Sequence, residues 1–447
     1  MPPSVLYTKI DTRPPEVIHS QGNYLHTSDG RTIFDASGGA AVACLGHNEP
    51  RVKQAIMAQL NQTAYVYSPF FTVPAAEEIA TFLTESTRGE MSKVFIVSSG
   101  TEAIEAALKM ARQYFTELPE PQLQRTRFIA RRQSYHGNTL GSLAAGGHKA
   151  RRAIFEPILA TSTSHVSPCY PYRDMMDGES NEEYVSRLAE ELENEFQQVG
   201  PDTVCAFIAE TMSGTTLGCV PAVPGYLKAI KQVCDRHGAL FVLDEVMSGM
   251  GRTGTLHAWE QEGVVPDLQT VAKGLGAGYA PVGALLVGNR VADALGRGTG
   301  SFTHSQTYQG HPIACATACA VQKIIQEENL LENVRRQGEY LGRLLNERLG
   351  GHRNVGDVRG RGLFWALEFV RDKATKEPFP VEVGIAQKVH LTGLQKEHSI
   401  SVIPGVGVAD GRNGDIIQIA PAYNVSRQDI ELIVERVEGV VHAVFGV

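Results

Sequence analysis

The segment Ala239-Leu240-Phe241-Val242-Leu243-Asp244-Glu245-Val246 indicates the architecture that we expect for this chain. Its five consecutive apolar residues lack polar alternation, a pattern typical of a parallel strand that is covered on both faces. Helical segments separate this run from three similar ones between about residues 90 and 290. These are Lys93–Val97, Phe128–Ala130 and Val204–Ala209. Strand and helix in series predict an α/β fold with a mainly parallel sheet and right-handed crossovers.

A chain of 447 residues is too long for one ordinary core, so we expect more than one domain. Residues 51–310 contain the alternating strands and helices, and we assign them to a large domain. Two long helices are expected between about 312 and 348, followed by a strand at 363–368. We therefore assign 311–447 to a connecting helix and a smaller C-terminal α/β domain, which the N-terminal segment 1–50 joins.

The composition indicates an ordinary soluble protein and argues against nucleic acid or a membrane as its partner. The net charge is −8 and the pI is near 6.0, whereas those partners require clustered basic surface. No apolar run approaches the roughly 18 residues that a membrane-spanning helix needs. No secretory or transit signal is visible at the start, so we expect a cytoplasmic protein. The seven cysteines include no C-x-x-C pair, and we expect reduced, buried thiols rather than a zinc site or another metal site.

Residues that can carry chemistry follow three of the expected strands, and in parallel sheets ligands bind at the carboxyl ends of strands. The first group is Ser98-Ser99-Gly100-Thr101-Glu102. Ser99 and Glu102 have capping-box spacing, and the N-terminus of the helix that follows can bind an anion. A plain helix cap without a ligand is the alternative.

The second and third groups contain Asp244 and Lys273. Asp244 ends an apolar run, where a carboxylate needs a cation or hydrogen-bond donors. A protonated pyridine nitrogen would suit it, and a carboxylate that caps a loop is the alternative. Lys273 stands between Val271-Ala272 and a glycine-rich stretch, 274–278. A lysine in a partly apolar pocket has a lowered pKa and can act as a nucleophile, whereas most lysines are simply solvated.

The segment Gly249-Met250-Gly251-Arg252-Thr253-Gly254 matches the dinucleotide-binding pattern G-x-G-x-x-G. The residues that follow do not continue as a capped amphipathic helix, and no acid follows a second strand at the required spacing. We therefore disfavour a nucleotide-dependent enzyme.

Seven short motifs occur in an order that resembles one family, the class III (ω-) aminotransferases, which depend on pyridoxal phosphate and have fold type I. The resemblance covers nearly the whole chain from about Asp35. It implies a large domain with a mainly parallel, seven-stranded type of sheet and a smaller α/β domain. The motifs are Ser99-Gly100-Thr101-Glu102-Ala103, Ser134-Tyr135-His136-Gly137, Ala209-Glu210, Leu243-Asp244-Glu245-Val246, Gly251-Arg252-Thr253-Gly254, Ala272-Lys273-Gly274 and Thr307-Tyr308-Gln309-Gly310-His311-Pro312.

The same resemblance implies two catalytic residues. Lys273 would hold pyridoxal phosphate as a Schiff base and then move a proton between the substrate and the cofactor. Asp244 would pair with the pyridine N–H and keep the ring electron-withdrawing.

The resemblance also implies further contacts to the cofactor. Ser99, Gly100 and Thr101 would hold the phosphate, and Glu210 would lie near the cofactor. Tyr135 would stack on one face of the ring and Val246 would pack on the other, although a core aromatic and an ordinary strand residue are the alternatives. His136 belongs to the same set, but we favour a structural histidine in a turn, with its hydrogen bonds satisfied. Thr307 would reach the phosphate of the neighbouring subunit, which implies a homodimer with shared active sites.

Departures from the family pattern bear on the substrate. Relatives that act on ornithine or 4-aminobutyrate have a glutamate where this chain has Thr215 and an arginine where it has Gln418. A gate for α-carboxylates is therefore doubtful. Arg412 lies near the place of a mobile arginine in amine-accepting relatives, where it can bind a keto-acid carboxylate. A surface loop arginine is the alternative. Small residues around Ala41, together with nearby aromatic residues, hint at a roomy apolar pocket; these are Tyr67, Phe70 and Phe71.

The sequence thus predicts a transaminase that moves an amino group from an amine or ω-amino compound to a small 2-oxo acid such as pyruvate, in a ping-pong reaction. An aminomutase, racemase or decarboxylase could use the same lysine and aspartate, because the pocket selects the bond that breaks. A non-catalytic binding protein is disfavoured by the presence of both residues.

Overall fold

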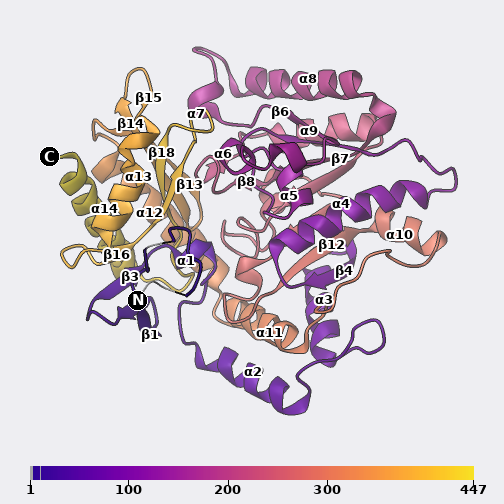
Figure 1. Cartoon of the computed structure of the whole chain (residues 1–447), viewed down its shortest axis with the longest axis horizontal. Coiled ribbons are helices and arrows are strands. Elements are labelled where there is room, and N and C mark those ends of the chain that lie inside the picture. The colour runs from indigo at the N-terminus through magenta and orange to yellow at the C-terminus, as the bar shows by residue number, and fades with distance from the viewer. Residues whose placement is uncertain (1–3, 11, 447) are drawn as a thin grey trace.

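The centre of the computed structural model, which describes residues 4–10 and 12–446, is a seven-stranded sheet (Figure 1). Strand β10 (Leu240–Asp244) is parallel to its neighbours β7 (Val204–Glu210) and β11 (Leu268–Val271). Only β12 (Gly283–Gly288) runs antiparallel to both of its neighbours. The full order is β4-β12-β11-β10-β7-β5-β6, where β4 is Met91–Val97, β5 is Arg127–Arg131 and β6 is Thr163–Val166. The expected α/β fold with a mainly parallel sheet is confirmed.

Both faces of this sheet are covered, which explains why its strands lack polar alternation. Phe207 and Phe241 pack with helices α8 (Asn181–Val199) and α9 (Tyr226–Arg236). Their neighbours Ala206 and Leu240 point to the other face and pack with α4 (Gly100–Thr116) and α10 (Asn289–Arg297). Every residue of β7 and β10 is buried. The four apolar runs of the sequence form the strands β4, β5, β7 and β10.

A second layered unit follows the large sheet in the chain. Helices α11 (Pro312–Glu327) and α12 (Leu330–Leu349) lead into a smaller antiparallel sheet of order β13-β14-β18-β17. Its strands are β13 (Val355–Arg361), β14 (Phe364–Asp372), β17 (Ile403–Val406) and β18 (Asp415–Ile419), and β15 (Glu377–Pro378) pairs with β14. Helices α12, α13 (Ile385–Gly393) and α14 (Arg427–Phe445) pack with these strands in one apolar core.

The N-terminal segment completes its own sheet with a strand from the C-terminal part. β1 (Val17–Gln21), β2 (Tyr24–Thr27) and β3 (Thr32–Asp35) are antiparallel neighbours, and β16 (Ile400–Ser401) pairs in parallel with β3. Figure 1 shows these indigo strands beside the yellow C-terminal elements. The boundaries expected at residues 50 and 310 stay predictions.

Shorter elements connect these layers. They are α1 (Gly38–Ala41), α2 (Pro50–Gln62), α3 (Pro74–Ser86), α5 (Leu140–Ala145), α6 (Lys149–Arg152), α7 (Pro171–Asp174), β8 (Met212–Ser213) and β9 (Val220–Pro221). Within the part of the chain that the structure describes, no helix has the length and apolar character required to cross a membrane. All seven cysteines are free, and six of them are buried.

Candidate active site

A cavity of about 430 Å³ lies at the carboxyl ends of the parallel strands. The strand register brings its polar residues together, because Asp244 at the end of β10 is paired with Glu210 at the end of β7 and with Thr270 in β11. Lys273 is the second residue after β11 and lines the same cavity. The wall consists of Val42, Ser98, Ser99, Gly100, Thr101, Tyr135, His136, Gly137, Glu210, Met212, Asp244, Val246, Met247, Ala272, Lys273, Gly278, Ala280, Pro281 and Val282.

The N-terminus of α4 forms one side of this cavity. Ser99 is the N-cap, and its Oγ accepts a hydrogen bond from Glu102 N (3.3 Å). The expected capping box forms only in part, because the Glu102 carboxylate accepts from Ser98 N (2.7 Å), one residue before the cap. The first N–H groups of an α-helix have no partner within the helix. Those of Gly100 and Thr101 are therefore available for an anionic ligand.

Gly100 makes a close approach between α4 and the opposite wall possible. A Cβ atom built at Gly100 would lie 2.7 Å from Val246 Cγ2, closer than real Cβ contacts allow. Gly137, in the loop after Tyr135 and His136, is similarly crowded, because a Cβ atom there would clash with Thr101 Oγ1. Its φ of +127° also favours glycine. These two glycines let the N-terminus of α4, Val246 and the Tyr135-His136 loop surround a narrow space.

Asp244 is buried and held by several donors. Its Oδ1 accepts from Val246 N (3.0 Å) and Thr270 Oγ1 (3.4 Å), and its Oδ2 lies 2.8 Å from His136 Nδ1. We expected His136 to be a structural turn histidine, and this stays a prediction. Its Nδ1 contacts a carboxylate from another strand, and its buried Nε2 has no partner in the described residues. This contact could not be inferred from the sequence, because His136 and Asp244 are far apart in the chain and come together only in the folded sheet.

Lys273 is suited to nucleophilic chemistry. Burial of its ammonium group lowers the pKa to about 8, although the carboxylates of Asp244 and Glu210 act in the opposite direction. The chain holds Lys273 with a φ of +45°, at the start of a short 3-10 turn (273–275) after β11. A pKa near 8 leaves a sizeable fraction of the amine neutral at physiological pH.

Glu210 adds a second buried acid to the cavity. Its Oε1 accepts from Gly214 N (3.2 Å), and its Oε2 has no hydrogen-bond partner in the part of the chain described, with Arg131 3.7 Å away. Burial raises the pKa of this carboxyl, and the Asp244 charge adds to that effect. The cavity therefore combines one amine with two acids whose charges the surrounding protein only partly balances.

Several residues that the sequence singled out lie outside this cavity. Thr307 is exposed, and its backbone oxygen accepts from Tyr65 Oη (2.9 Å). Phe70 and Phe71 are 75% and 65% exposed, and Tyr67 packs edge-on against Phe70. Their predicted roles toward cofactor and substrate stay predictions.

Ala41 and Arg412 also stand away from the cavity wall. Ala41 is buried in a small apolar cluster with Met212 and Phe364, and its neighbour Val42 takes the place at the cavity. Arg412 is on the surface, where its guanidinium pairs with Glu382 (2.6 Å).

Gln418 lies directly beneath the loop that bears Thr215. Its buried Nε2 donates to Gly214 O (2.9 Å) and contacts Cys219 Sγ (3.4 Å). Thr215 Oγ1 points to Met247 Sδ (3.4 Å) instead. Gln418 is therefore engaged with the loop and offers no positive charge to a substrate.

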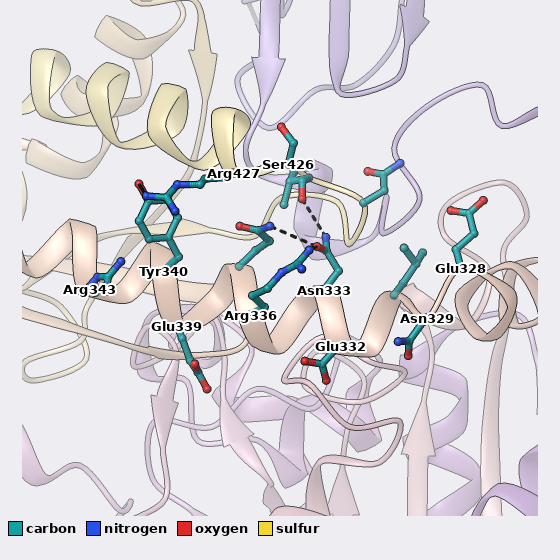
Figure 2. Close-up of a pocket in the computed structure, with 14 residues that line it drawn as sticks. Glu328, Asn329, Glu332, Asn333, Arg336, Glu339, Tyr340, Arg343, Ser426 and Arg427 are labelled. Atoms are coloured by element: carbon teal, nitrogen blue, oxygen red, sulfur yellow. Dashed lines mark hydrogen bonds between the residues drawn. The ribbon is translucent and has the colours of Figure 1, made fainter.

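A larger groove of about 1100 Å³ lies elsewhere, between α12 and the start of α14. Figure 2 shows polar side chains along α12, among them Asn333 and Tyr340, with Ser426 and Arg427 opposite. Arg427 and Arg343 each lie over the Tyr340 ring, at 4.5 and 5.2 Å from its centroid. This surface groove contains no residue from the carboxyl edge of the seven-stranded sheet. The smaller cavity, with its buried amine and acids, is the better candidate for chemistry.

A mainly parallel sheet that brings a lysine and an aspartate together at its carboxyl edge is the arrangement of fold type I pyridoxal-phosphate enzymes. The family described as aminotransferase class-III matches residues 10–441. The chain belongs to this family and is an aminotransferase.

Individual relatives agree with this assignment. A protein named aminotransferase from Gibberella zeae is 54% identical over 99% of this chain and 86% of its own length. Gamma aminobutyrate transaminase 3 from Solanum lycopersicum is 35% identical, over 95% of this chain and 80% of its own. The solved structure of an amine transaminase from an uncultivated Pseudomonas species, in a PLP-bound form, has a TM-score of 0.88 at 32% identity. It covers 96% of this chain and 94% of that one.

Pyridoxal phosphate is the cofactor of this enzyme, and the residues present fit it. The free N–H groups at the N-terminus of α4 suit a phosphate. Asp244 presents a carboxylate to the interior of the cavity, where a protonated ring nitrogen would balance its charge. The orphaned Nε2 of His136 and Oε2 of Glu210 are buried polar atoms that bound cofactor or water can satisfy.

Proposed function

We propose that this aminotransferase takes an amine or ω-amino compound as donor and a small 2-oxo acid such as pyruvate as acceptor, in a ping-pong reaction. The observation that carries the proposal is the cavity wall. It includes the apolar side chains of Val42, Met212, Met247 and Val282, and among the described residues that form it there is no arginine. An α-carboxylate on the donor would have no guanidinium partner there, whereas an uncharged amine chain fits.

The proposed roles follow from the contacts. When bound, pyridoxal phosphate supplies a conjugated ring that takes up the electron pair released at the carbon of the substrate amine. Lys273 binds the cofactor through its neutral amine and, once released, moves a proton at the reacting carbon. Asp244 would accept a hydrogen bond from the ring N–H, and His136 holds Asp244 in position through the 2.8 Å contact.

Other wall residues would position the cofactor. Tyr135 would cover one ring face and Val246 the other, since both line the cavity. The α4 terminus at Ser99, Gly100 and Thr101 binds the phosphate. The apolar wall, with Met212 and Met247, excludes water from the reacting atoms.

We also propose a cytoplasmic homodimer. The exposed side chains of Phe70, Phe71 and Tyr308 leave an apolar surface beside the exposed Thr307. A second copy of the chain that covers this surface would bring Thr307 close to the partner's phosphate site. Light scattering on the purified holoenzyme should give twice the chain mass, and a monomeric active enzyme would contradict the shared-site arrangement.

A panel of donors with pyruvate as acceptor tests the substrate proposal. Arylalkyl and aliphatic amines should be converted more efficiently than ornithine. The γ-aminobutyrate transaminase among the relatives makes 4-aminobutyrate the informative competitor. A strong preference for 4-aminobutyrate or ornithine would overturn our interpretation of Thr215 and Gln418.

A further inference from the structure

Glu245 is a fully buried acid that has no part in the reaction described so far. Its carboxylate accepts four hydrogen bonds, all from neutral groups, which are Thr211 Oγ1 (2.8 Å), Trp259 N (2.7 Å), Ala258 N (2.8 Å) and Gln269 Nε2 (2.9 Å). Burial raises the pKa of Glu245 to about 7, although these hydrogen bonds act in the opposite direction. Four donors suit an ionised carboxylate, because that group only accepts hydrogen bonds.

The four donors come from three separate segments of the large domain. Thr211 directly follows β7, and Gln269 lies within β11. The two backbone donors begin the short 3-10 helix Ala258–Glu262. Glu245 itself directly follows β10. Its side chain therefore ties the ends of β7 and β10 to β11 and to a turn that follows later in the chain.

Two contacts connect this anchored side chain to Asp244. Val246 N donates to Asp244 Oδ1 (3.0 Å), so Glu245 is the one residue between the active-site acid and this donor. Thr211 holds both acids, because its N–H donates to Asp244 O (3.3 Å) while its hydroxyl donates to Glu245. A shift of Glu245 would therefore move the N–H that orients Asp244, together with the Val246 side chain on the cavity wall.

A glutamine at position 245 could not satisfy the same donors. One backbone N–H donates to each carboxylate oxygen, that of Trp259 to Oε1 and that of Ala258 to Oε2. An amide has one oxygen and an NH2 group that donates. Either orientation of the amide would turn its NH2 group toward a backbone N–H and leave that buried donor without an acceptor. The arrangement thus requires a carboxylate rather than a side chain of the same shape.

We propose that Glu245 is a positioning residue, whose anchored carboxylate fixes Asp244 and Val246 in the orientation that the bound cofactor requires. This inference rests on the role proposed for Asp244 toward the ring nitrogen. Glu245 does not line the cavity that the described residues form, so it acts through its neighbours and not on the substrate.

A double-mutant cycle with Glu245→Gln and Asp244→Asn tests this indirect action. Rates are measured well above the pKa of Glu245, where its carboxylate is ionised. Alone, Glu245→Gln should lower kcat of the holoenzyme on the order of 10- to 100-fold and leave KM for the amine donor nearly unchanged. In the Asp244→Asn background the same substitution should lower kcat by less than about 3-fold, because the carboxylate that Glu245 positions is already absent.

Binding of pyridoxal phosphate to the cofactor-free protein gives a measurement that does not depend on turnover. In a fluorescence titration, Glu245→Gln should weaken the affinity by about 10-fold, since a displaced Asp244 loses part of its charge-assisted bond to the ring N–H. The double variant should bind no more weakly than Asp244→Asn alone. The absorbance spectrum of the cofactor bound to Glu245→Gln should resemble that of Asp244→Asn.

Two further variants complete the design. Asp415→Asn is the matched control, because Asp415 is also a buried acid that accepts from a backbone N–H, that of Ala386 (2.8 Å). It lies on β18 of the small sheet, and its replacement should change neither kcat nor cofactor affinity. Thr211→Val serves if Glu245→Gln fails to fold. It removes one donor and keeps the branched shape, and it should lower kcat about 3- to 10-fold, but not in the Asp244→Asn background.

Other outcomes would overturn the inference. Equal fractional losses in the two backgrounds would show that Glu245 does not act through Asp244. Unchanged kcat and cofactor affinity, with only a lower melting temperature, would make Glu245 a purely structural acid. If Asp244→Asn itself keeps the wild-type rate and affinity, the role proposed for Asp244 fails, which is distinguishable from failure of the Glu245 assignment alone.

Discussion

His136 Nδ1 lies 2.8 Å from Asp244 Oδ2, and both side chains are buried. Because an ionised carboxylate only accepts hydrogen bonds, Nδ1 carries the proton in this contact. The imidazole thus orients the acid that faces the cofactor ring. His136→Phe, which keeps a ring but removes the donor, should lower turnover by about 10- to 100-fold, as expected for a lost bond of about 1.5–3 kcal/mol.

Steady-state rates and the absorbance spectrum of the bound cofactor measure this effect. His136→Gln offers an amide donor and should recover part of the rate. If the Phe and Gln variants have equal activities, the hydrogen bond from position 136 to Asp244 does not contribute to turnover.

Lys273 should react with aldehydes at an unusually low pH. Its pKa near 8 means that, in cofactor-free protein, the rate of adduct formation with pyridoxal phosphate rises to half its maximum around pH 8. An ordinary lysine would require a pH above 10. Rates measured across this range by absorbance test the point, and a profile that keeps rising to pH 10 would refute the lowered pKa.

The lowered pKa of Lys273 also makes the stability of the cofactor-free protein depend on pH. The pKa of Lys273 in the unfolded chain is 10.5, and in the folded chain it is about 8. Between these values the unfolded state binds more protons, so the contribution of Lys273 to the free energy of unfolding rises with pH. Below pH 8 the folded cofactor-free protein carries the full cost of a buried ammonium. Lys273→Met should therefore raise the melting temperature at pH 7 and leave it nearly unchanged above pH 10.5.

Gly100→Ala should disturb the cavity. The added Cβ would lie 2.7 Å from Val246 Cγ2, so the valine must move, at a cost of about 1–3 kcal/mol for overpacking. We expect weaker binding of pyridoxal phosphate in a fluorescence titration. The matched control is Gly296→Ala in α10, where a Cβ has nothing within 4 Å. That change should be neutral or stabilise by about 0.5–1 kcal/mol. Equal behaviour of the two variants would contradict the steric argument.

A buried ion cluster should stabilise the contact between the large sheet's loops and the small sheet. Glu368 on β14 is fully buried and pairs with Arg359 NH1 (2.7 Å), while its other oxygen accepts from Arg173 Nε (2.7 Å). Glu368→Gln leaves the Arg173 guanidinium without its carboxylate partner and Arg359 with Asp357 alone, and should cost about 3–5 kcal/mol in the free energy of unfolding.

Chemical denaturation measures that cost. The control is Glu347→Gln, which breaks an exposed pair with Arg343 and should change stability by about 0–1 kcal/mol. If both variants lose the same small free energy of unfolding, the buried cluster contributes no more to stability than a surface ion pair.

The large sheet could be predicted from the sequence because several of its strands contain runs of apolar residues without polar alternation, and helices separate these runs. The same logic located Asp244, since it ends an apolar run and so stands at the carboxyl edge, and Lys273 was identified from its place between Val271-Ala272 and a glycine-rich stretch. These inferences are local: each needs only a strand and the residue after it.

Contacts between segments that are far apart in the chain could not be predicted from the sequence by this reasoning. The His136–Asp244 bond and the stacking of Arg151 on Tyr135 depend on how a turn, a short helix and a strand end pack together. The capping box at Ser99 is likewise only partial because the Glu102 carboxylate accepts from Ser98 N, one residue before the position that the motif predicts. Arg412, Phe70 and Phe71 were selected from the family pattern, and the single chain leaves them at the surface, where only a partner subunit or a loop movement would bring them to the cavity.

Borohydride reduction of the holoenzyme, followed by proteolysis and mass spectrometry, tests the central claim most directly. The account predicts a reduced pyridoxal phosphate adduct on the peptide that contains Lys273 and its absence from the Lys273→Ala variant. An unmodified Lys273 peptide, or an adduct on a different lysine, would contradict it.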